Sequence, residues 1–266
     1  MRCRLTPILA LALALILAAV GCATFEDGMR AYKEGDYAAA VEVWRPLAED
    51  GNADAQFNIG LIYMEGHTGE ADPAEAAKWY RMAADRGQAD AQNNLGLLYY
   101  LVRGVPRDDA EAVRLFQAAA DQGHGQASFN LGRMYARGQG VPQDAELAVS
   151  LFRTAADKGV AEAAHSLGVM YGSGLDLKRD DQAAAKWYRQ AAEAGYAEAQ
   201  NNLCAMYSAG RGVPRNYVEA LTWCDLAATQ GNQTAQRNRG IIAERMTAAE
   251  IETAAERTAA RRPRGQ

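Results

Sequence analysis

Apolar and small residues recur at spacings of three and four along most of the chain, which indicates amphipathic helices. Residues 89–124 show the pattern most clearly, because a stripe containing Ala91 and Leu95 is followed by a second stripe containing Ala112 and Leu115. Two helices of about twelve residues cannot bury such stripes alone. Neighbouring helix pairs must therefore stack on one another.

The helix pair repeats every 36 residues without insertion or deletion. One shared position holds the glycines Gly51, Gly87, Gly123, Gly159, Gly195 and Gly231, and another holds the alanines Ala40, Ala76, Ala112, Ala148, Ala184 and Ala220. A fixed period of this length is typical of a stacked array and not of a globular domain with one closed core. We therefore predict an all-α, right-handed α-solenoid of antiparallel helix pairs.

The repeat also divides the chain. We expect a tetratricopeptide-like capping helix pair within 22–52 and polar capping helices with a basic tail in 233–266, where the repeat pattern decays. The five complete units between these caps are 53–88, 89–124, 125–160, 161–196 and 197–232.

Helix ends and helix contacts have their own signals. Asp72, Asp108 and Asn216 are each followed three residues later by Glu, the spacing of a capping box. Glycine recurs inside the first helix of four units, as at Gly60 and Gly168, although it costs about 1 kcal/mol there relative to Ala. We expect that the second helix, with its recurring Ala, approaches the backbone closely at this glycine.

The N-terminus has the pattern of an export signal. Arg2 and Arg4 precede an unbroken apolar stretch over 8–20, and small residues follow. This order of charged, apolar and small residues predicts a secretory signal peptide over 1–21.

A second motif overlaps the end of this segment. The tetrapeptide Ala19-Val20-Gly21-Cys22 resembles a bacterial lipobox, in which the cysteine is lipidated and becomes the mature N-terminus. The resemblance implies a lipid anchor at Cys22, and Ala23 after it implies sorting to the outer membrane. Ordinary cleavage after Gly21 is the alternative. We expect a monomer on the periplasmic side of the bacterial cell envelope.

Several short motifs resemble one known family. They are AEAQNNL from 197, the Leu-Gly pairs at 95, 131 and 167, GxGVPxD from 138 and AxxxxRxAAxxG from 184. These motifs resemble Sel-like repeats (SLR), a subfamily of tetratricopeptide-like proteins. The resemblance implies a non-enzymatic scaffold or adaptor that binds a protein or peptide. Two alternatives that it also implies are a β-lactam-binding or hydrolysing protein and a structural component of polysaccharide-export or cell-wall machinery.

The charges and the chemically reactive residues argue against nucleic-acid binding and catalysis. The 28 Lys and Arg are scattered among 33 Asp and Glu, so no basic footprint for nucleic acid is present. His67, His124 and His165 do not have metal-ligand spacing, and no nucleophile motif is found. We therefore predict no catalytic residue, metal or cofactor. Arg261, Arg262 and Arg264 either complement a helix end or contact an anionic surface.

Two cysteines depart from the repeat. Cys204 stands where other first helices have Gly, and Cys224 stands where other second helices have an aromatic residue. Both exceptions lie in one unit, on faces that should meet, and an oxidising envelope favours disulfides. We predict a Cys204–Cys224 disulfide, with two small buried thiols as the alternative.

The predicted ligand groove lies along the first helices. Two adjacent positions supply its side chains: Phe57, Asn58, Asn93, Asn94, Phe129, Asn130, His165, Asn201 and Asn202. The asparagine position can instead bond the neighbouring repeat, whereas the variable position before it should determine specificity. On this assignment His165→Ala should leave stability nearly unchanged.

Overall fold

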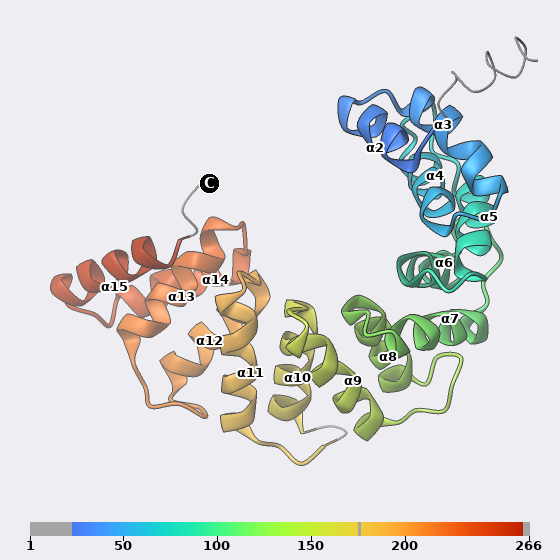
Figure 1. The fold of residues 1–266 in the computed structure, drawn as a ribbon. Coiled ribbons are helices and arrows are strands. Elements are labelled where there is room, and N and C mark those ends of the chain that lie inside the picture. The colour runs from blue at the N-terminus through green and yellow to red at the C-terminus, as the bar shows by residue number, and fades with distance from the viewer. Residues whose placement is uncertain (1–22, 175–176, 263–266) are drawn as a thin grey trace, which may run out of the picture. The chain divides into compact units, whose positions relative to one another are not determined.

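The computed structural model describes residues 23–174 and 177–262. The predicted signal peptide over 1–21, the lipidation site Cys22 and Arg264 lie outside these residues. Within them the chain forms fourteen helices and no strand (Figure 1). The predicted all-α class is therefore confirmed, and no helix in the described part of the chain is long and apolar enough to cross a membrane.

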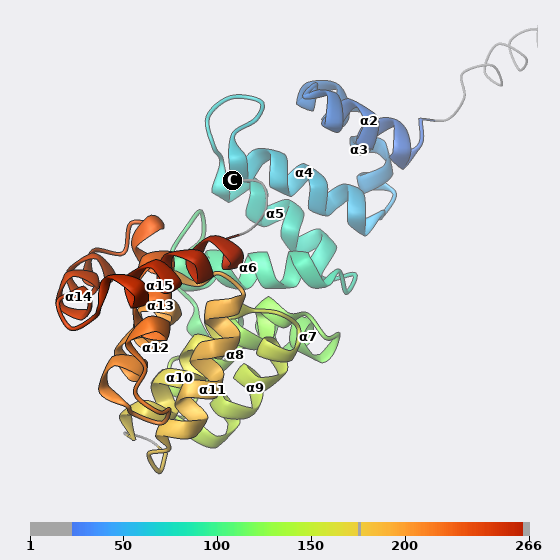
Figure 2. The ribbon, with the colours of Figure 1, turned by 90° about the vertical axis from the view of Figure 1, so that its left-hand side faces the viewer.

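The chain divides into two compact units, which meet at Pro106 and Arg107 in the sequence. The first unit contains α2 (Phe25–Glu34), α3 (Tyr37–Glu49), α4 (Ala53–Glu65), α5 (Pro73–Ala84) and α6 (Ala89–Leu101). The second contains α7 (Asp109–Asp121), α8 (Gly125–Arg137), α9 (Ala145–Asp157), α10 (Ala161–Ser173), α11 (Asp181–Glu193), α12 (Ala197–Ala209), α13 (Tyr217–Thr229), α14 (Gln233–Ala243) and α15 (Ala248–Arg261). Within each unit, helices adjacent in sequence from α2 to α6 and from α7 to α14 pack side by side (Figures 1 and 2). The last helix, α15, packs on α13.

The glycine inside α4, α8 and α10 makes room for an aromatic ring of the following helix. A Cβ atom built on Gly60 would lie 2.6 Å from the ring of Tyr80, and one built on Gly168 would lie 2.5 Å from the ring of Tyr188. Gly132 has the same relation to Phe152, at 2.8 Å. The expected close approach of the second helix at this glycine is confirmed, but the group that approaches is its aromatic ring and not its Ala. The ring of the second helix lies against the glycine because only a residue without a side chain leaves enough space.

Two glycines of the same repeat position should respond oppositely to substitution. Gly168→Ala should lower the free energy of unfolding by about 1–3 kcal/mol, because the added methyl group overlaps the Tyr188 ring. Gly240→Ala should raise it by about 0.5–1 kcal/mol, because nothing lies within 4 Å of the added methyl group and Ala favours a helix. Urea unfolding followed by circular dichroism measures both changes. Losses of equal size would contradict the ring-contact assignment.

The predicted helix starts are present, but the glutamates have another role. Asp72, Asp108 and Asn216 each accept a hydrogen bond from the backbone N–H three residues later. In a capping box the Glu side chain would also accept a hydrogen bond from the backbone N–H of the first residue. Instead, Glu75 forms an ion pair with Lys78, and Glu111 forms one with Arg114. A reciprocal capping box does form at Thr247 and Glu250, where it starts α15.

An Arg–Tyr contact joins successive repeats. An arginine of one second helix donates to the tyrosine hydroxyl of the next first helix, 18 residues later in the sequence. The pairs are Arg45 with Tyr63 at 3.5 Å, Arg81 with Tyr99, Arg153 with Tyr171 at 2.5 Å and Arg189 with Tyr207 at 2.5 Å. The recurring tyrosine therefore links neighbouring repeats.

Candidate functional site

Three residues of the predicted groove are buried. Phe129 is 8% exposed and lies in the core of the second unit, where its ring centroid is 5.7 Å from that of Phe152. Asn93 and Asn130 are each 5% exposed. The assignment of these three side chains to a ligand surface is wrong, because a partner would have no access to them in the folded chain.

His165 is half-buried and is part of the packing between repeats. Its ring lies 5.7 Å from that of Tyr188 and 5.1 Å from that of Tyr196, and its Nε2 is 3.1 Å from the Asn202 amide nitrogen. Burial lowers the pKa of His165, although the carboxylate of Glu198 partly opposes this. These contacts mean that His165→Ala should cost stability, contrary to the expectation from the sequence.

The remaining groove residues also make contacts within their units. Asn238 donates to the Asn201 side-chain oxygen at 3.2 Å, which joins α14 to α12. Asn58 lies 4.0 Å from the Met29 sulfur, and Asn94 accepts from Asn93 at 3.2 Å. Phe57 packs on the Tyr80 ring at 5.8 Å, and burial raises the pKa of Tyr80 to about 12. These contacts favour the alternative in which the asparagines shape the stack.

A row that the sequence analysis missed lies one turn further along the first helices. Val169 on α10 is 42% exposed and Ile241 on α14 is 55% exposed, and Ala205 on α12 is exposed between them in the repeat order. We call Val169, Ala205 and Ile241 the apolar row. The signal was available, because the same repeat position also carries Leu61 and Leu97 next to the glycine, although α8 has Arg133 there.

The predicted disulfide is present between α12 and α13. Cys204 and Cys224 are fully buried and joined, with their Cα atoms 5.4 Å apart. They occupy the places that Gly168 and Tyr188 hold in the preceding repeat. The bridge therefore replaces the glycine–ring contact by a covalent link at the same point of the repeat.

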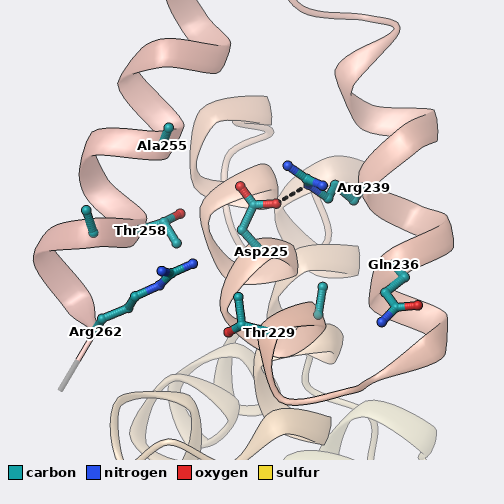
Figure 3. Close-up of a pocket in the computed structure, with 9 residues that line it drawn as sticks. Asp225, Thr229, Gln236, Arg239, Ala255, Thr258 and Arg262 are labelled. Atoms are coloured by element: carbon teal, nitrogen blue, oxygen red, sulfur yellow. Dashed lines mark ion pairs between the residues drawn. The ribbon is translucent and has the colours of Figure 1, made fainter. Parts of the chain in front are cut away.

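A cavity opens at the C-terminal end of the second unit. It has a volume of about 570 Å³ and lies between α13, α14 and α15 (Figure 3). Asp225 and Thr229 come from α13, Gln236 and Arg239 from α14, and Thr258 from α15. Arg262, which directly follows α15, also lines it. From the sequence this region was predicted only as a cap, without Asp225 or a cavity.

One ion pair spans the wall of this cavity. The Arg239 Nε lies 2.5 Å from an Asp225 carboxylate oxygen, as drawn in Figure 3. Burial raises the pKa of Asp225, and the guanidinium of Arg239 opposes the rise. Both residues break the repeat, because Asp225 replaces the arginine of the Arg–Tyr contact and Arg239 replaces a core leucine such as Leu203. This double exception was the sequence signal for the site.

The terminal arginines have contacts of different kinds. Arg261 lies 3.1 Å from Glu219 and 4.7 Å from the centre of the Trp223 ring, so it fastens α15 to α13. Arg262 faces the cavity. In the described part of the chain, no group of three His, Cys, Asp or Glu side chains could hold a metal ion.

Comparison with known proteins identifies the repeat. The model of the Sel1 repeat matches residues 53–88, 89–124, 125–160, 161–196 and 197–232. No curated protein matches the chain.

Two solved structures are similar over most of the chain. A Sel1 repeat protein from Oxalobacter formigenes has 30% identity and a TM-score of 0.76, with 91% of this chain and 98% of that one covered. A protective antigen of uropathogenic Escherichia coli strains, which displays an SLR fold, has 36% identity and a TM-score of 0.78. That match covers 85% of this chain and 48% of the antigen, so the chain spans about half of the antigen's length.

Sel1 repeat proteins generally mediate protein–protein interactions and are generally non-enzymatic scaffolds. The repeat model covers more than half of the chain, and the solved structures share its all-α solenoid fold. The chain therefore belongs to the Sel1 repeat family.

Proposed function

We propose that the protein is a non-enzymatic scaffold that binds a protein or peptide along the first helices α10, α12 and α14 of its second unit. The observation that carries the proposal is the apolar row. Val169 and Ile241 are large apolar side chains that are about half exposed. In α10 the residue before Val169 is Gly168, which packs against the Tyr188 ring, so the buried and the exposed sides of the helix are adjacent there. Apolar side chains that recur in line on one surface are typical of an interaction site.

The packing of the repeat supports this assignment. The other recurring features hold the stack together. The Ala and Leu residues are buried, the glycine–ring contacts pack the two helices of a repeat, and the Arg–Tyr contacts join successive repeats. The apolar row makes no such contribution to the core. Its side chains also differ between repeats, so they can discriminate between partners where the identical packing residues cannot.

The proposed place of action is the periplasmic side of the bacterial cell envelope, with the outer membrane reached through a lipid on Cys22. The signal-like segment over 1–21 and the lipobox-like sequence ending at Cys22 support it. The Cys204–Cys224 bridge is consistent with it, because disulfides persist in oxidising compartments. Membrane fractionation of a Cys22→Ser variant tests the anchor, and retention in the membrane fraction would contradict it.

Affinity purification after brief crosslinking tests the binding surface. We expect the full chain in its native envelope to capture a protein partner. The Val169→Glu/Ala205→Glu variant should recover at least about ten-fold less of this partner. The reason is that two carboxylates would have to be desolvated against an apolar partner surface. Both positions are exposed, so melting temperatures should stay close to that of the wild type.

A matched control lies on a second helix. Leu147 on α9 is 37% exposed, so Leu147→Glu adds a carboxylate at an exposed apolar position outside the apolar row. We expect this variant to capture the partner as the wild type does. Equal capture by the row variant and the control would contradict the proposed surface, as would a wild-type chain that captures no protein.

A further inference from the structure

One face of α14 is uncovered, although the same face of the preceding first helices is covered. In α10, the side chains of Ala164 and Leu167 are buried together with Gly168, because the second helix α11 packs on them. The corresponding residues of α14 are Gln236, Arg239 and Gly240, and all three are exposed. At Gly240 nothing lies within 4 Å of the Cβ position, whereas the Tyr188 ring fills that space beside Gly168. The ring-receiving site of α14 is therefore open.

The chain's own last helix does not fill that place. A second helix in the repeat order would put Ala at 256 and an aromatic residue at 260, but α15 has Glu256 and Ala260 there. Its connection to α14 spans only residues 244–247, compared with 210–216 between α12 and α13. With a short connection and no ring to insert, α15 cannot take the usual position on α14.

Instead, α15 is held on α13. The Thr258 hydroxyl donates to the Thr222 backbone oxygen at 3.5 Å, and the Thr222 hydroxyl donates to the Ala254 backbone oxygen at 3.4 Å. Arg257 lies 2.5 Å from Glu219 on α13. These contacts leave the cavity of about 570 Å³ between α14 and α15, with α13 as its floor (Figure 3). We call this space the α14–α15 groove.

We propose that the α14–α15 groove, together with the open Gly240 position that directly follows its lining residue Arg239, binds an acidic amphipathic helix of another protein, whose aromatic ring packs beside Gly240. The partner helix would supply the contact that a regular second helix makes in this repeat. Its pattern would be that of this chain's own second helices, in which a small residue is followed four residues later by an aromatic one, as in Ala184 and Tyr188. Binding of one apolar helix face in a groove is a recurring mode of recognition.

The charges that line the groove favour an acidic partner over a basic one. Its lining contains two arginines, Arg239 and Arg262, and one acid, Asp225, which pairs with Arg239. Next to Gly240 the exposed charges are of both signs, Arg237 one turn before it and Glu244 one turn after it, so the preference comes from the lining itself. A basic helix would meet like charge at this surface, while an acidic one would be attracted to it. A second copy of this chain is less suitable, because its second helices already use their rings within their own repeats.

Fluorescence anisotropy with a defined peptide tests this proposal. The probe is a labelled peptide of residues 181–193 with Lys186→Glu and Arg189→Glu, held helical by a side-chain staple on its outer face. The titrant is the full chain. We expect saturable binding, with at least about ten-fold weaker affinity for a probe that also carries Tyr188→Ala, because that probe has no ring to insert. A probe that keeps Lys186 and Arg189 should bind more weakly than the acidic one.

The matched protein variant is Gly240→Leu, which places a side chain in the open ring-receiving site. Because the Cβ position is open and Leu favours a helix over Gly, this variant should be at least as stable as the wild type and lose at least about ten-fold in affinity for the acidic probe. The same staple and label are used in the probes with and without the Tyr188 ring, so that only the ring differs between them. Unchanged binding to Gly240→Leu, or equal binding of these two probes, would overturn the proposal.

Binding of the acidic probe does not depend on the apolar row. The Val169→Glu/Ala205→Glu variant should bind the acidic probe as the wild type does, so failure of one surface can be told apart from failure of the other. Sedimentation of the chain alone identifies the competing occupant. If the chain associates with itself and this displaces the probe, a second copy fills the groove and the inference of a foreign helix is overturned.

Discussion

Phe129→Ala should lower the free energy of unfolding by about 3–5 kcal/mol, the usual loss for removing a buried phenylalanine. The side chain is 8% exposed, packs on Phe152 and lies within the core cluster of the second unit. Removing the ring leaves a cavity between α8 and α9 that the surrounding helices can fill only in part. Urea unfolding followed by circular dichroism measures the loss.

His165→Ala, at the same position of the next repeat, is the matched control. We expect a smaller loss of about 1–2 kcal/mol, because His165 is only half-buried and contributes ring contacts and one hydrogen bond. A loss below about 1 kcal/mol for Phe129→Ala would contradict its assignment to the core. A partner lost on Phe129→Ala would report damage to the fold, which is why the apolar row is the better surface to change.

Replacing both bridged cysteines with Ser should lower the free energy of unfolding by about 3 kcal/mol, because the bridge closes a loop with a sequence separation of 20. Cys204→Gly combined with Cys224→Tyr should recover most of that loss. This pair restores the glycine–ring contact that Gly168 and Tyr188 make in the preceding repeat. Thermal unfolding with and without a reductant measures both effects.

The reductant separates the covalent bond from the packing. Only the wild type should lose stability when it is reduced, and the Gly–Tyr and Ser–Ser variants should not respond. If the Gly–Tyr variant were no more stable than the Ser–Ser variant, the bridge would not be a replacement for the ring contact. A wild type that is unaffected by full reduction would show that the bridge adds no stability.

The site was harder to predict than the fold. Phe57, Phe129 and His165 share one repeat position, and the sequence suggested that such variable side chains face a ligand. In the structure each lies on an aromatic residue of its second helix. Helical spacing indicates which side of a helix a residue is on, but it does not say how far the neighbouring helix extends over that side.

The period, the helix pairs, the helix starts at Asp72, Asp108 and Asn216 and the Cys204–Cys224 pairing could all be inferred from the amino-acid sequence. These features depend on local chemistry or on residues that recur at a constant offset, so one chain contains enough information for them. The approach of rings, and not alanines, to the first-helix glycines became known only from the packing of the helices. The same holds for α15, which packs on α13 and leaves Gly240 uncovered, because the place of the last helix depends on the contacts available to it after the repeat has ended.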